Sequence, residues 1–124
     1  MNQVMSKDGT AIAFDRSGKG PAVILVGGAF QYRAIDPPTA QLAALFAQHF
    51  TVFHYDRRGR GASLDTQPYA VEREIEDLEA VINAAGESAF VFGMSSGGVL
   101  ALDAAGRGLA IKKTGVIRAT IQLR

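Results

Sequence analysis

Cysteine and tryptophan are absent from the 124 residues, and histidine occurs only twice. The absence of cysteine excludes disulfide bonds and thiolate metal sites. It also fits a reducing compartment, so we expect a cytoplasmic protein. An excess of charge is missing too, because 13 Lys and Arg residues face 12 Asp and Glu residues. Balanced charge gives no reason to expect a nucleic-acid partner.

Long apolar runs are also missing. None approaches the roughly 18 to 20 residues that a membrane-spanning helix needs. Residues 1–15 lack the basic segment and apolar run of a secretory signal. We therefore expect a soluble protein without a membrane partner. Its length and its 48% hydrophobic content suit one domain with a substantial core.

What the sequence does contain is a regular alternation of strand and helix patterns. The continuous apolar run Ala22–Val26 is typical of a strand buried on both faces. The Asp8-Gly9 pair favours a hairpin at the N-terminus. These patterns predict the α/β class: a mostly parallel sheet with flanking helices and an N-terminal antiparallel hairpin. Strands are predicted at residues 4–6, 10–15, 22–26, 50–55 and 89–92, and helices at 40–48, 71–85 and 96–105.

One glycine-rich corner has the pattern of a catalytic site. Gly93-Met94-Ser95-Ser96-Gly97 fits G-x-S-x-G between a predicted strand and a predicted helix. Such a turn exposes its serine at the carboxyl end of the sheet, and the small residues Gly93 and Gly97 relieve crowding between strand and helix. Ser95 is then the candidate nucleophile, and the N–H of Ser96 would face the oxyanion. In the alternative interpretation, the glycines only make a tight turn and Ser95 caps the helix.

A second glycine turn, Gly27-Gly28, follows the buried strand at residues 22–26. The carboxyl ends of parallel strands meet at one edge of a sheet, where ligands bind. The N–H of Ala29 could therefore supply a second oxyanion donor beside Ser95. A plain tight turn is the alternative for this motif.

These motifs, in this order, resemble the α/β-hydrolase family. A third motif lies between them and matches the pattern D-x-R-G-x-G-x-S through Asp56, Arg58, Gly59, Gly61 and Ser63. The resemblance covers about residues 4–113, which correspond to the N-terminal half of a family member. It implies a small-molecule substrate with an ester, related acyl or C–C bond, and neither a cofactor nor a metal. It also implies Ser95 as nucleophile, Ala29 and Ser96 as oxyanion donors, and Gly27, Gly28, Gly93 and Gly97 as turn residues.

The chain departs from the family in the residues that should activate the serine. In the family an acid and then a histidine follow the nucleophile, whereas residues 96–124 contain one acid, Asp103, and no histidine. Asp103 is predicted to lie on the surface of its helix. His49 is predicted at a helix end, and a strand should separate His54 from Ser95. We therefore expect weak or no activity from this chain, and whether it is an enzyme stays open.

Residues 114–124 differ from the buried strand that the family would supply. Their alternating pattern predicts a half-exposed strand. We interpret residues 1–113 as half of a hydrolase domain and residues 114–124 as a divergent tail from a shifted frame, a truncation or a rearrangement. An edge strand that completes a small sheet is the alternative. An exposed sheet edge would favour self-association.

Two other functions stay open at this point. The glycine turns could bind a phosphate or nucleotide, although neither fits the P-loop or dinucleotide pattern. The chain could also be a non-functional product. The arginines at positions 57, 58 and 60 and the acidic residues at 72–79 are interpreted as solvated charges.

Overall fold

The computed structural model describes residues 2–86 and 88–117, and these residues form one six-stranded sheet. The strand order is β1-β2-β4-β3-β5-β6. The pairs β1–β2 and β2–β4 are antiparallel, whereas β3, β4, β5 and β6 run parallel. The predicted α/β class with an N-terminal hairpin is therefore confirmed. The strands are β1 Asn2–Met5, β2 Ala11–Gly18, β3 Ala22–Val26, β4 Thr51–Tyr55, β5 Ala89–Met94 and β6 Ile111–Ile117.

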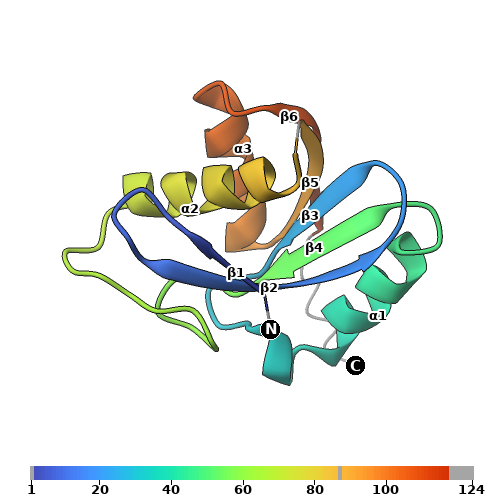
Figure 1. The fold of residues 1–124 in the computed structure, drawn as a ribbon, viewed down its shortest axis with the longest axis horizontal. Coiled ribbons are helices and arrows are strands. Elements are labelled where there is room, and N and C mark those ends of the chain that lie inside the picture. The colour runs from blue at the N-terminus through green and yellow to red at the C-terminus, as the bar shows by residue number, and fades with distance from the viewer. Residues whose placement is uncertain (1, 87, 118–124) are drawn as a thin grey trace, which may run out of the picture.

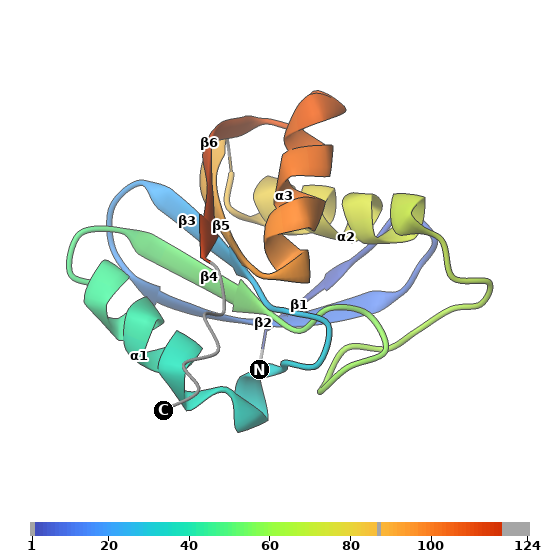
Figure 2. The same cartoon turned by 180° about the vertical axis from the view of Figure 1, so that it is seen from behind.

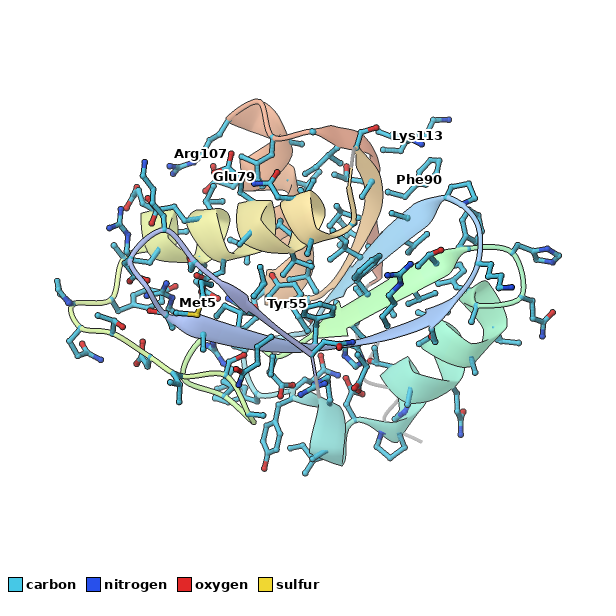
Figure 3. The ribbon with its side chains drawn as sticks, in the orientation of Figure 1. Met5, Tyr55, Glu79, Phe90, Arg107 and Lys113 are labelled. Carbon is cyan, nitrogen blue, oxygen red and sulfur yellow. The ribbon has the colours of Figure 1, made fainter. Side chains whose placement is uncertain are left out.

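Helices cover both faces of the sheet. Helices α2 and α3 lie on one face and α1 on the other (Figures 1 and 2). The side chains of β3 alternate between the two layers, so that Ile24 packs toward α2 and α3, and Leu25 toward α1. Figure 3 shows Tyr55 of β4 under α2, in the larger of the two apolar clusters. The helices are α1 Pro37–Phe46, α2 Val71–Ala84 and α3 Ser96–Gly106, with a 3₁₀ turn η1 at Arg33–Ile35.

Some boundaries differ from the predicted ones. Strand β2 continues to Gly18, three residues beyond the predicted end at residue 15, because its second half pairs with β4. Helix α1 begins at Pro37, three residues early, where the Asp36 side chain accepts a hydrogen bond from the Thr39 N–H. Strand β6 crosses the proposed boundary at residue 113, and that boundary stays a prediction. The predicted tail strand lies mostly in residues 118–124, outside the described residues.

Arg58 occupies a buried position between the hairpin turn and α2. Its guanidinium donates to both carboxylate oxygens of Asp77 at 2.7 Å and to Asp8 at 3.0 Å. Arg58 is 2% exposed and Asp77 is 1% exposed. The interpretation of these charges as solvated was therefore wrong. The polarity of a side chain alone predicts that it is exposed to solvent. An arginine and a carboxylate can nevertheless be buried together, because each neutralises the charge of the other and supplies its hydrogen-bond partners.

The Asp8–Arg58 contact should make the fold sensitive to acid. Hydrogen bonds from Arg58 and Thr10 lower the pKa of Asp8 in the folded chain. The pKa of an Asp side chain in an unfolded chain is about 3.9. Below roughly pH 4 the unfolded state therefore binds more protons than the folded state, and the stabilisation that the ionised Asp8 provides is lost. We expect Asp8→Asn to reduce the free energy of unfolding at pH 7 by roughly 1–3 kcal/mol, and the difference from wild type should shrink as the pH falls below about 4.

Urea unfolding of both proteins between pH 3 and pH 7 measures this effect. Glu79→Gln is the matched control, because Glu79 is exposed on the outer side of α2 (Figure 3), and it should unfold like wild type. A difference between Asp8→Asn and wild type that stays constant over the whole pH range would contradict the expectation.

Candidate active site

Ser95 is the single residue between β5 and α3, at the carboxyl end of the sheet. Its backbone has φ 51° and ψ −115°. Among residues 2–86 and 88–117 it is the one non-glycine residue with positive φ. Such a conformation costs on the order of 1–3 kcal/mol and is found mostly at functional sites. The serine side chain is exposed, so its hydroxyl can meet a ligand.

The turn at Ser95 depends on two glycines that allow close backbone approach. A Cβ atom at Gly93 would overlap the carbonyl of Gly97 and the nitrogen of Gly98. A Cβ atom at Gly97 would overlap the carbonyls of Val26 and Gly27 at the end of β3. Both glycines have negative or extended φ, so space and not backbone freedom selects them. The first turn of α3 therefore sits directly against the ends of β5 and β3.

The alternative role of Ser95 as a side-chain cap is not what the structure shows. Ser95 is at the N-cap position of α3, but its side chain makes no capping hydrogen bond. The Ser95 carbonyl accepts from Gly98 N–H at 2.9 Å, as an N-cap carbonyl does. The hydroxyl therefore has no capping function in this turn.

The predicted second donor, Ala29, lies in the turn that follows β3. This turn is closed by two hydrogen bonds between Gly28 and Gln31: Gln31 N–H donates to the Gly28 carbonyl, and Gly28 N–H donates to Gln31 Oε1. Within the described part of the chain, the N–H groups of Ala29 and Ser96 donate no intramolecular hydrogen bond. Because β3 and β5 are adjacent and parallel, both donors lie at the carboxyl edge of the sheet.

Of the four predicted turn glycines, only some require glycine. Gly93 and Gly97 do, for the reason given above. A Cβ atom at Gly28 would lie 2.7 Å from Gln31 Oε1, the end of a flexible side chain. A Cβ atom at Gly27 would meet nothing closer than 3.7 Å, so this position has room for a side chain.

Arg57 and Glu74 adjoin the site and were missed at the level of sequence. Both are buried, and Arg57 donates Nε to Glu74 Oε1 at 2.7 Å and Nη2 to Glu74 Oε2 at 2.8 Å. Burial alone disfavours the Glu74 carboxylate, but hydrogen bonds from Arg57 and Tyr69 outweigh it, so the pKa of Glu74 is lowered. A signal did exist, because Glu74 lies one helical turn before Leu78 and one turn after Val71, next to the inward-facing Ile75 in α2.

A cleft of about 430 Å³ adjoins Ala29 and is lined by the loops after β3 and β4. Phe30 at its rim is 94% exposed, and Arg60 is its charged lining residue. A neighbouring cleft of about 580 Å³ shares Tyr32 and Gly61 and adds Asp15, Arg33, Ala34, Asp56 and Ala62. Ser95 is not among the lining residues of either cleft, and the proposed donor residue Ala29 lines the smaller one.

The remaining acid–base candidates lie away from Ser95. His54 is buried in β4, its pKa is lowered by burial, and β3 lies between β4 and β5, as predicted. His49 is exposed before β4, at the opposite edge of the sheet from Ser95. Asp103 is a surface residue, also as predicted, and pairs with Arg107 at 3.0 Å.

Neither a metal site nor a membrane span is found in residues 2–86 and 88–117. Their His, Asp and Glu side chains form no group of three or more that could hold a metal ion. None of the helices in this part combines the length and apolar character needed to cross a bilayer.

Comparison with known proteins agrees with this architecture. The model of the Alpha/beta hydrolase family matches residues 23–121. The crystal structure of an alpha/beta hydrolase from Sphaerobacter thermophilus DSM 20745 superposes with a TM-score of 0.87 at 63% identity, over 93% of this chain and 44% of that one. A hydrolase from Pseudomonas aeruginosa PA01 gives a TM-score of 0.79 at 29% identity, over 91% and 43%. The chain belongs to the alpha/beta hydrolase family and spans less than half the length of these structures.

A further similar structure is the bottromycin epimerase BotH in complex with bottromycin A2. It is 32% identical, with a TM-score of 0.81 over 93% of this chain and 47% of that one. Relatives at this level of similarity thus include proteins named for a reaction other than hydrolysis. Family membership therefore fixes the scaffold of this chain more firmly than its chemistry.

The close approach at Gly97 can be tested by adding one methyl group. We expect Gly97→Ala to destabilise the protein by roughly 1–3 kcal/mol or more, because the methyl group meets backbone atoms that cannot rotate away. Gly106→Ala is the matched control in the same helix, since its Cβ atom has no neighbour within 4 Å, and it should be neutral or slightly stabilising. Thermal unfolding of both variants measures this, and equal melting temperatures would contradict the packing described here.

Proposed function

We propose that this chain carries the nucleophile and the oxyanion donors of a serine hydrolase for small molecules with an ester, related acyl or C–C bond. Ser95 is the nucleophile, and the N–H groups of Ala29 and Ser96 bind the developing oxyanion. The observation that carries the proposal is the strained, exposed Ser95 in a turn whose hydroxyl has no capping function.

The helix behind Ser95 supports this assignment. The first turn of α3 presents unpaired N–H groups and the positive end of the helix dipole toward the space above Ser95. Such donors stabilise an oxyanion because they are already oriented before the reaction begins. The chemistry requires no cofactor.

Neither histidine of the chain is placed to act as the general base of this site. Neither histidine adjoins Ser95: one is a strand away and one lies at the opposite sheet edge. A serine without its base keeps only the part of the rate that binding and the oxyanion donors supply, on the order of 10³- to 10⁴-fold over water. We therefore propose weak or undetectable turnover for residues 1–124 on their own.

Binding of a small molecule without hydrolysis is the second candidate. It is favoured by the cleft beside Ala29 and the cleft next to it, and by the similarity to an epimerase structure that contains bottromycin A2. The same residues would line the ligand site in both cases, but only hydrolysis requires a reactive Ser95.

A fluorophosphonate probe separates the two candidates, because it bonds covalently to an activated serine. We expect slow labelling of Ser95, located by peptide mass spectrometry, and no labelling of Ser95→Ala. Ser17→Ala is the matched control, since Ser17 is an exposed serine on β2, and it should label like wild type. Absence of labelling in well-folded wild-type protein would remove the claim of an active nucleophile and leave binding.

A further inference from the structure

Arg57 connects the two segments that carry the proposed oxyanion donors. It follows β4, and its Nη1 donates to the Gly27 carbonyl at 3.2 Å and to the Ser96 hydroxyl at 3.0 Å. Gly27 lies two residues before Ala29 in the turn after β3. Ser96 is the first residue of α3. One nitrogen atom thus bonds both sides of the site.

The other end of the Arg57 guanidinium is held on α2. Nε and Nη2 form the two-pronged pair with Glu74, which also accepts a hydrogen bond from the Tyr69 hydroxyl at 2.6 Å. Arg57 is 7% exposed and Glu74 is 1% exposed. A bidentate pair fixes the plane of the guanidinium as well as its position, so Nη1 has little freedom to leave its two acceptors.

We propose that Arg57 is a positioning residue that sets the distance between the Ala29 and Ser96 N–H groups, with Glu74 fixing Arg57 in turn. This inference rests on the proposed function of these two donors. Oxyanion stabilisation is sensitive to donor placement, and a shift of about 1 Å can cost on the order of 100-fold in rate. The reaction therefore needs a link that fixes the two donor segments relative to each other, whereas folding of the chain does not require one.

Arg57→Lys tests the proposal because it keeps the charge but has only one nitrogen to serve Glu74, Gly27 and Ser96. In fluorophosphonate labelling we expect the maximal rate constant at Ser95 to fall by about 10- to 100-fold, with the concentration for half-maximal rate unchanged. Arg107→Lys is the matched control: Arg107 is an exposed arginine at the C-terminal end of α3 (Figure 3) that pairs with Asp103 and Glu72, and its variant should react like wild type.

A second variant and a second measurement distinguish loss of positioning from simple unfolding of Arg57→Lys. Ser96→Ala removes only the hydroxyl acceptor and leaves the Arg57–Glu74 pair in place. Because both variants break one link, Ser96→Ala in the Arg57→Lys background should add little further loss. In NMR spectra recorded at a temperature where circular dichroism shows both variants fully folded, the amide resonances of Ala29 and Ser96 should shift in Arg57→Lys and stay unchanged in Arg107→Lys.

The outcomes separate this inference from the proposed function. If wild type labels at Ser95 and Arg57→Lys labels equally fast, the positioning role is overturned and the nucleophile stands. If wild type does not label, the active nucleophile fails and the amide resonances decide: a shift of both in Arg57→Lys upholds the positioning of the two segments. Unshifted Ala29 and Ser96 resonances overturn it. A rate loss that vanishes once the labelling rate is corrected for the folded fraction of Arg57→Lys would also overturn it, in favour of a purely structural role.

Discussion

Two consecutive arginines at the end of β4 hold the carboxyl edge of the sheet together. Arg57 pairs with Glu74, and Arg58 pairs with Asp77, one turn further along α2. Each guanidinium also reaches beyond α2. Arg58 reaches the hairpin turn through Asp8, whereas Arg57 reaches the turn after β3 through the Gly27 carbonyl and α3 through Ser96. The two pairs thereby fix α2 against β4, and α2 in turn fixes the loops that surround Ser95.

A second constraint is steric. The chain passes from β5 to α3 at Ser95, and the first turn of α3 must fit between the ends of β5 and β3. Only residues without a Cβ atom fit at Gly93 and Gly97. The strain at Ser95 follows from this geometry, because a helix that starts one residue after a strand, in contact with the neighbouring strand, leaves the residue between them no relaxed conformation.

The sequence predicted the apolar framework well and the buried charges poorly. Runs such as Ala22–Val26 are predictable, because burial of apolar surface imposes a period of two or 3.6 residues. The predicted helix stripe Val71, Ile75, Leu78 and Ile82 is buried except for Val71 in the first turn of α2, which is exposed. Glu74 and Asp77 fall on the same inward face, but an analysis by polarity assigns them to solvent. Their burial depends on arginines about twenty residues earlier in the chain, and no local pattern contains that pairing. The turn at Ser95 was predictable because its constraint is local: β5, two glycines and α3 lie within the eighteen residues Ala89–Gly106.

The energetics of the Arg57–Glu74 pair indicate what it contributes. Removing two charges from water costs several kcal/mol per ion, and apolar side chains of similar volume can often replace a buried pair without loss of stability. An apolar residue at position 57 would, however, leave the Gly27 carbonyl and the Ser96 hydroxyl without a donor, at about 1–3 kcal/mol for each buried group. The position of α3 relative to the turn after β3 would then depend on apolar packing alone, which is not directional. A guanidinium is the side chain that can bind a carboxylate with one edge and two further oxygens with the other end. The pair is therefore best understood as a geometric device for this sheet edge, where orientation matters more than the stability that an apolar contact would provide.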